Sequence, residues 1–402
     1  MSSLIERLRA KDKKGYYDSS TTTIFYPTGF TTLDYRNSSL FKIYNENDEI
    51  VNSYTQLGVQ DGSINTLVSE TGVGKTTLIC AMAYNIVKPF DNGMVMHMDI
   101  EETFSLGRAK DITGMPRKDI NSKYILIQEK LYINDILTRI KEIHDAKFEF
   151  KKEYEYDTGF VDERGKKIIK FVPTVIIIDS LKVMQMDADK IGEMEGATSN
   201  QRKAQSITMF MEKITPICKA ANIIVLIINH LKTKIEMNMF SKTKAQLTFM
   251  SNKNKTIPGG DAALYLSSNV WYIDNCGKYT VEENGFSGSK CKLWLWKTRS
   301  NFAGTNCPMV FNQQFGFDDT MAMYNVLLDN ELIGGRNPKR YILGSPEVTF
   351  DDRKLYEEMQ TRPELRDAIK ERAIDVMKEW TSSKATKNDD EDEENDENDD
   401  EK

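Results

Sequence analysis

Seven short apolar runs, separated by helical segments between residues 62 and 300, constrain the fold of this chain more than any other feature. Each run has the length of a strand and is apolar at most positions, as expected for strands buried on both faces. The runs are Ile64–Val68, Met94–Ile100, Tyr124–Ile127, Thr174–Ile178, Ile223–Ile228, Val270–Ile273 and Leu293–Trp296. Helices are predicted between them at Thr77–Val87, Ile133–Asp145 and Ser206–Ala221. The pattern therefore predicts an α/β fold with a mostly parallel sheet covered by helices on both faces.

The first run leads into a glycine-containing loop and then into a helix, which is the setting of a phosphate-binding loop. The loop departs from the pattern GxxxxGK[ST] only at Ser69, which replaces the first glycine. Backbone N–H groups and the helix N-terminus surround phosphate oxygens in such loops. We expect Lys75 to reach the β- and γ-phosphates and the Thr76 hydroxyl to bind Mg²⁺. The predicted nucleotide contacts are Glu70, Thr71, Gly72, Val73, Gly74, Lys75, Thr76 and Thr77.

Three later strands end in polar residues, and ligands of parallel sheets gather at the carboxyl ends of the strands. Asp179 follows the strand Thr174–Ile178 and is predicted to hold Mg²⁺. Glu101, chosen over its neighbour Glu102, is predicted to orient and deprotonate a water molecule that attacks the γ-phosphate. His230 ends a third strand, where a polar side chain can contact the γ-phosphate.

The segment 231–258, here called the basic segment, contains six lysines against one acid, Glu236, for a net charge of +5. Lysines attract phosphates, and aromatic side chains stack on bases without reading sequence. A long segment without periodicity is uncommon in a compact domain unless it has a function. We therefore predict that it binds single-stranded nucleic acid; a solvated loop with its aromatics in the core is the alternative. The side chains concerned are Lys232, Lys234, Phe240, Lys242, Lys244, Phe249, Lys253 and Lys255.

Composition excludes several other classes of protein. The five cysteines are scattered without a CxxC pair, which argues against a disulfide framework or a zinc site and favours a reducing cytoplasm. No apolar run approaches the roughly 18 residues that span a bilayer, so no membrane partner is expected. The net charge of −7 comes from residues 384–402, which hold eleven acids and three lysines, leaving residues 1–383 at +1. An anionic partner for the body of the protein is therefore compatible with the composition.

The chain divides into four predicted regions. Residues 1–60 begin with a short basic amphipathic helix, which packs either on its own body or on a neighbouring subunit, followed by a linker. Residues 61–326 form the α/β core, in which the charged stretch 148–171 is a hairpin or an irregular insertion. Residues 327–383 form a smaller region that ends in a helix at Arg362–Trp380, and the acidic residues 384–402 are predicted to be disordered.

Together these motifs resemble the RecA family of strand-exchange recombinases, and most closely the UvsX recombinases of T-even-like phages. The resemblance covers most of residues 1–380 and implies a RecA-like P-loop NTPase core with a short N-terminal oligomerisation segment and a small C-terminal helical region. Its markers, besides the phosphate loop, are Met1–Leu8, Asp99–Glu101, Ile177–Ser180, Ile228–His230, Pro258–Gly260, Lys297–Arg299 and Pro363–Lys370.

The resemblance assigns roles to particular residues. Glu101 matches the catalytic carboxylate, and His230 matches the switch that links the γ-phosphate to the second DNA-binding loop, residues 231–258. Lys297 and Arg299 match a basic pair that a neighbouring subunit inserts at the nucleotide. Arg108 occupies the place of the adenine-stacking tyrosine, where a guanidinium can also stack. A first DNA-binding loop corresponds to 187–203, with Arg202 and Lys203 for phosphates.

The expected function is that of a DNA-dependent ATPase that uses ATP and Mg²⁺ to form a helical filament on single-stranded DNA. It would pair that strand with homologous double-stranded DNA in recombination and repair, with single-strand-binding and loader proteins as candidate further partners. If the chain is phage-encoded, its place would be the host cytoplasm. A DnaB-type hexameric helicase is the alternative, because Thr28–Asp34 resembles that core too; a non-catalytic ATP-binding recombination mediator is another.

Overall fold

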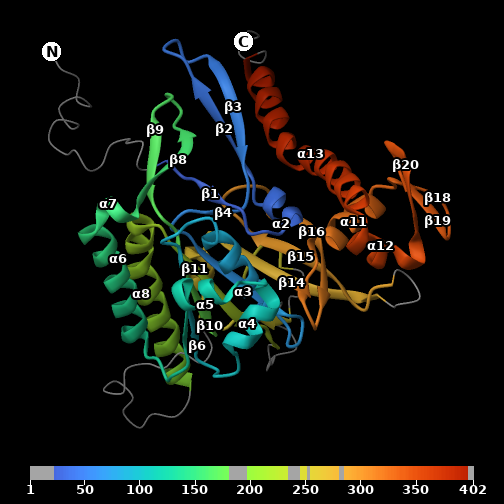
Figure 1. Ribbon diagram of the computed structural model, residues 1–402. Coiled ribbons are helices and arrows are strands. Elements are labelled where there is room, and N and C mark those ends of the chain that lie inside the picture. The colour runs from blue at the N-terminus through green and yellow to red at the C-terminus, as the bar shows by residue number, and fades with distance from the viewer. Residues whose placement is uncertain (1–21, 181–196, 234–244, 251–253, 280–284, 397–402) are drawn as a thin grey trace, which may run out of the picture.

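The computed structural model describes residues 22–180, 197–233, 245–250, 254–279 and 285–396. A nine-stranded sheet forms the centre of the molecule, in the order β17-β16-β15-β14-β5-β11-β10-β6-β7 (Figure 1). The six strands from β14 to β7 are mutually parallel, and β15, β16 and β17 extend the sheet in antiparallel fashion. The strands are β5 (Ile64–Ser69), β6 (Met94–Asp99), β7 (Tyr124–Ile127), β10 (Thr174–Asp179), β11 (Ile223–His230), β14 (Asn269–Tyr279), β15 (Gly288–Lys297), β16 (Asn306–Asn312) and β17 (Gly316–Phe317).

The prediction of a mostly parallel sheet is confirmed, and each of the seven apolar runs forms one of its strands. Strands β16 and β17 were not predicted. β16 contains Pro308, which lacks a backbone donor, and begins and ends with asparagine, a residue depleted in strands. β17 has only two residues, which is too short to show any pattern.

Helices cover both faces of the central strands. Along β10, Val175 and Ile177 point into one buried cluster while Ile176 and Ile178 point into another, as the two-residue period of a strand requires. Helix α3 (Lys75–Val87) contributes to the first cluster. Helices α6 (Ile133–Glu149) and α8 (Ala197–Ala221) lie together over the second (Figure 1). The shorter helices of this region are α4 (Leu106–Thr113), α5 (Arg117–Lys123), α7 (Lys151–Tyr154) and α9 (Asp261–Leu266).

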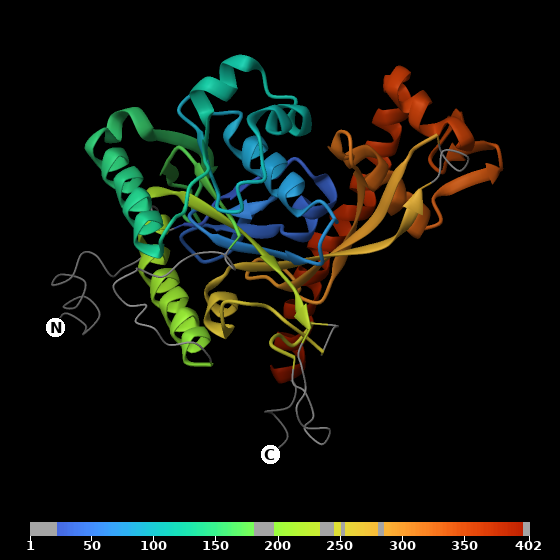
Figure 2. The same cartoon turned by 90° about the horizontal axis from the view of Figure 1, so that it is seen from below.

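The C-terminal region has a core of its own. Figure 2 shows β14 and β15 reaching from the central sheet to this region, where Tyr279 and Phe286 from the far end of this strand pair join its buried cluster. Its elements are α11 (Asp319–Asp329), β18 (Ile333–Arg336), β19 (Lys339–Ile342), β20 (Ser345–Asp351), η3 (Asp352–Lys354), α12 (Leu355–Thr361) and α13 (Pro363–Asp396). The boundary expected at residue 327 therefore falls inside α11. Helix α13 continues past Trp380 to Asp396, into the segment predicted to be disordered; the sequence after Pro363 contains no proline or glycine.

Two hairpins project side by side from the core (Figure 1). The first hairpin consists of β2 (Ser39–Tyr44) and β3 (Ile50–Gln56), and the second of β8 (Glu155–Val161) and β9 (Lys167–Phe171). The charged stretch 148–171 is therefore largely a hairpin. The Tyr54 hydroxyl donates to the Val161 carbonyl at 2.6 Å, and its ring stacks on Phe160. The remaining N-terminal elements are β1 (Phe25–Tyr26), α2 (Thr31–Arg36) and β4 (Val59–Gln60); the amphipathic helix predicted at 1–14 lies outside the described residues.

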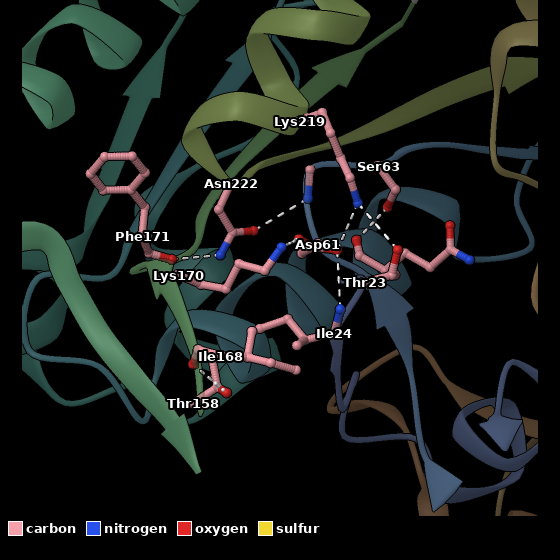
Figure 3. Close-up of polar contacts among 12 residues, drawn as sticks. Thr23, Ile24, Asp61, Ser63, Thr158, Ile168, Lys170, Phe171, Lys219 and Asn222 are labelled. Atoms are coloured by element: carbon pink, nitrogen blue, oxygen red, sulfur yellow. Dashed lines mark hydrogen bonds and ion pairs between the residues drawn. The ribbon is translucent and has the colours of Figure 1, made fainter. Parts of the chain in front are cut away.

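A buried carboxylate, Asp61, fastens the second hairpin and the N-terminal strand to the core (Figure 3). It accepts a hydrogen bond from Lys170 of β9 at 2.8 Å, one from Lys219 of α8 at 3.0 Å and one from the Ile24 N–H at 3.2 Å. The Asp61 side chain is fully buried, and burial lowers the pKa of Lys170, whose charge Asp61 supports. Three segments distant in sequence thus share one acceptor.

In the described part of the chain, no helix has the length and hydrophobicity needed to cross a bilayer.

We predict that Asp61→Asn lowers the free energy of unfolding by about 2–4 kcal/mol, because it leaves the buried Lys170 ammonium without its charge partner. Urea unfolding followed by circular dichroism measures the change. Asp157→Asn is the matched control, since it removes an exposed ion pair with Lys167 on the same hairpin. Equal unfolding midpoints for the two variants would show that Asp61 does not anchor the hairpin.

Candidate nucleotide-binding site

The register of four parallel strands brings the predicted site residues to one edge of the sheet. Ser69 at the end of β5 pairs with His230 of β11, Ile228 of β11 pairs with Asp179 of β10, and Asp179 pairs with Asp99 of β6. The Ile100 N–H donates to the Asp179 carbonyl at 2.8 Å, which extends this pairing one residue further. The phosphate loop, the two acidic strand ends and the histidine therefore share one edge.

The loop predicted to bind phosphate joins β5 to α3 and has left-handed backbone at two glycines. Gly72 and Gly74 have φ angles of 86° and 83°, in the region that glycine adopts without strain, and α3 begins at Lys75. A Cβ at Gly72 would meet nothing within 4 Å, whereas one at Gly74 would lie 2.7 Å from the Phe311 ring. The buried Ser69 hydroxyl donates to the Glu70 carbonyl at 2.7 Å, so serine serves at the first glycine position. The loop is thus packed at its base and open at Gly72.

A lysine and an aspartate with shifted pKa values lie beside the loop. The Lys75 ammonium donates to the Glu70 carbonyl at 2.7 Å. Burial lowers the pKa of Lys75 to about 8, although the negative charges of Asp179 and Glu101 act in the other direction and raise it. The Thr76 hydroxyl donates to Asp179 Oδ2 at 2.7 Å. Burial raises the pKa of Asp179 to about 6; the Thr76 hydrogen bond lowers it, and the Glu101 and Asp99 charges raise it. Both groups are held partly out of water, so a ligand of opposite charge would interact strongly with each.

These residues fit Mg²⁺ and phosphate. Thr76 and Asp179 present two oxygens of the kind Mg²⁺ prefers. Asp99, at the end of β6, is completely buried and accepts hydrogen bonds at Oδ2 from the Phe104 N–H and the Gln128 amide, while its Oδ1 has no hydrogen-bond partner among the described residues. That free acceptor beside Asp179 suits a metal-bound water. Within the described ranges no group of three or more acidic, histidine or cysteine side chains could hold a metal by itself.

Glu101 and His230 lie together above the sheet edge. Glu101 Oε1 accepts a hydrogen bond from the Ser180 hydroxyl at 2.8 Å and lies 3.7 Å from His230 Nε2. The Glu101 side chain is about one-third exposed, so it can reach a ligand as well as its two neighbours. Ser180 was not singled out from the sequence, although its position directly after Asp179 could have suggested that it orients a nearby acid.

Arg108 also lies close to this edge. Its guanidinium donates to the carbonyls of Gln313 and Gln314 at 2.7 and 3.1 Å, in the turn between β16 and β17. Strand β17, which follows this turn, lies against the phosphate-loop helix, since a Cβ on Gly316 would meet the Thr77 methyl group at 3.1 Å. Arg108 is therefore near α3 but engaged by two backbone carbonyls.

Lys297 and Arg299 do not belong to this site within one chain. Lys297 of β15 pairs with Val270, near the start of β14. Asn269, the residue before Val270, pairs with Asn65 at the start of β5. Asn65 lies roughly 13 Å along β5 from Ser69. The Lys297 ammonium donates to the carbonyls of Leu264, Tyr265 and Ser267, and Arg299 donates to that of Tyr265. Burial and the Arg299 charge lower the pKa of Lys297 to about 8. The pair lies at the opposite edge of the sheet and caps the C-terminal end of α9.

Two short strands near the ends of the basic segment pair with each other, contrary to the expectation that the segment has no regular structure. Strand β12 (Lys232–Thr233) pairs with β13 (Lys255–Thr256), and the Lys255 ammonium lies 2.9 Å from Glu70 Oε1. Phe249 is half exposed and lies against Gly304. Of the other predicted DNA contacts, Lys234, Phe240, Lys242, Lys244 and Lys253 lie outside the described residues.

The expected first loop, 187–203, is corrected in part. Its residues from Ala197 onward form the start of α8, so Arg202 and Lys203 lie on a helix rather than in a loop. Residues 187–196 lie outside the described residues.

Comparison of the chain with protein-family models and with curated proteins found no match.

The two loop glycines provide a test of this geometry. We predict that Gly72→Ala costs about 1 kcal/mol through its left-handed backbone alone. Gly74→Ala should cost at least about 1 kcal/mol more, because its methyl group overlaps the buried Phe311 ring. Urea unfolding of both variants measures the difference, and adding Phe311→Leu should recover part of the Gly74→Ala loss. Equal costs for the two glycine variants would contradict the packing described at Gly74.

Proposed function

We propose that this protein is a DNA-dependent ATPase that forms a filament on single-stranded DNA and catalyses homologous pairing and strand exchange. One observation carries the proposal: the basic segment starts directly after His230, and His230 Nε2 lies 3.7 Å from Glu101, at the edge that holds the phosphate loop. A segment suited to nucleic acid is thus attached to a site suited to ATP hydrolysis.

In the proposed reaction, Lys75 and the loop N–H groups bind the phosphates of ATP. Thr76 and Asp179 would hold Mg²⁺, which when bound neutralises charge on the β- and γ-phosphates. Glu101 orients a water molecule and accepts its proton as the water oxygen bonds to the γ-phosphorus. The bond from the γ-phosphorus to the bridging oxygen breaks, and ADP and phosphate are the products. Ser180 fixes the Glu101 carboxylate for this step through its 2.8 Å hydrogen bond.

His230 is the proposed connection between hydrolysis and DNA. Its imidazole faces Glu101, while the next residue, Leu231, begins the basic segment. A change at the γ-phosphate that moves His230 therefore moves the strand pair β12–β13. The lysines of the segment attract the DNA backbone and its aromatics contact bases, which predicts strongly salt-dependent binding with little sequence preference.

A filament follows from the position of the second basic pair. Lys297 and Arg299 cannot reach the phosphate loop of their own chain, because they lie at the other edge of the sheet. We propose that they act on the nucleotide of a neighbouring subunit, exchanging their contacts with α9 carbonyls for contacts with phosphate. A head-to-tail contact of this kind extends into an open helix when the rotation between subunits does not close a ring.

We predict that Lys75→Ala weakens nucleotide binding at least about tenfold, because the phosphates lose their buried cation. Glu101→Gln should leave nucleotide affinity close to that of the parent protein and reduce turnover by about 10²–10⁴-fold, since an amide accepts no proton. Fluorescent-nucleotide titration and phosphate release, with and without single-stranded DNA, measure both effects. Glu102→Gln is the matched control and should turn over like the parent. If Glu102→Gln were the inactive variant instead, the assignment of the catalytic carboxylate would be wrong.

A further inference from the structure

We infer that Lys255, supplied by the basic segment, is a positioning residue of the phosphate site and acts by neutralising Glu70 inside the phosphate loop. The inference deepens the proposed function and rests on its nucleotide-binding part. It gives Lys255, predicted from the sequence only as a DNA contact, a second role at the nucleotide.

Glu70 touches both the catalytic lysine and the basic segment. It is the first residue after β5, its backbone carbonyl accepts the Lys75 ammonium at 2.7 Å, and its carboxylate pairs with Lys255 at 2.9 Å. Any displacement of Glu70 therefore changes the surroundings of Lys75 as well. The Glu70–Lys255 pair is a direct contact between the phosphate loop and the basic segment, independent of the contact between His230 and Glu101.

The negative charge of Glu70 is the reason why its contact with Lys255 should affect nucleotide binding. A carboxylate in a loop that receives a polyphosphate repels the ligand unless a cation offsets it. Lys255 supplies that cation at hydrogen-bonding distance; its side chain is 30% exposed and that of Glu70 is 59% exposed. Water screens a pair of this kind, so its expected effect on nucleotide binding is small.

The backbone around Lys255 is held to the same strands that carry the phosphate loop. Strand β13 pairs with β12, the Leu231 N–H donates to the Ser69 carbonyl at 3.3 Å, and the Asn229 amide donates to the Pro258 carbonyl at 2.7 Å. Ile257 is buried in a cluster that includes Val68 of β5. The fold thus delivers the Lys255 ammonium to Glu70 from a fixed base.

It follows that DNA and nucleotide affect each other through one cation. A ligand of the basic segment that moves Lys255 changes the charge beside the phosphate loop. Linkage then requires the nucleotide to act on binding at the segment through this residue with equal size.

The test is a charge cycle on the full chain, measured by titration with a fluorescent ATP analogue and Mg²⁺ in the absence of DNA. We expect Lys255→Gln to weaken nucleotide binding about three- to fivefold. The double variant Glu70→Gln/Lys255→Gln should bind like the parent, and Glu70→Gln alone should bind at least as tightly. Lys167→Gln, which removes a lysine paired with Asp157 at 2.8 Å far from the site, should change nothing. Urea midpoints confirm that each variant is folded.

Two results would overturn the inference: parent-like binding by Lys255→Gln, or a loss that persists in the double variant. A second arm adds a single-stranded oligonucleotide to the parent protein and tests the proposed function separately. Nucleotide binding without any binding of the oligonucleotide would refute the proposed function, while the charge cycle would still decide the role of Lys255. A parent protein that binds no nucleotide would refute both.

Discussion

The parallel pairing of β5, β11, β10 and β6 is the constraint on which the candidate site depends. Every residue of β10 is buried, with alternate side chains packed against helices on opposite faces. A slip of one residue would move every side chain of β10 to the opposite face, where it would meet a different set of packed neighbours, so close packing on the two faces holds the register. That register sets Asp179 beside Asp99 and His230 beside Ser69. The site chemistry therefore rests on apolar residues that never touch a ligand.

Much of the core could be predicted from the sequence because its signals are local. The apolar runs mark the parallel strands, and the glycines and Lys75 mark the phosphate loop. Contacts set by tertiary packing could not be predicted in this way. The hydrogen bond from Ser180 to Glu101 and the ion pair between Lys255 and Glu70 join residues 79 and 185 positions apart in the chain. The antiparallel sheet β18–β20 also escaped prediction, since its strands are only partly buried and two of them have only four residues.

The basic segment touches the candidate nucleotide site at both ends. His230 precedes it and faces Glu101, and Lys255 near its end pairs with Glu70. The first contact involves the proposed catalytic carboxylate, and the second involves the loop proposed to receive the phosphates. A segment fastened at two such points can respond to the presence of phosphate and to its hydrolysis separately. Lys297 and Arg299, at the far edge of the sheet, give the same nucleotide a proposed third connection, to the next subunit.

The most direct test of the proposed function is ATP turnover by the parent protein with and without single-stranded DNA, followed by electron microscopy of the same samples. We predict that single-stranded DNA raises turnover severalfold and that the ATP-bound samples contain long helical filaments. An equal rate of ATP turnover with and without single-stranded DNA would contradict the proposed coupling between hydrolysis and DNA binding. Closed rings in place of filaments would favour a hexameric helicase.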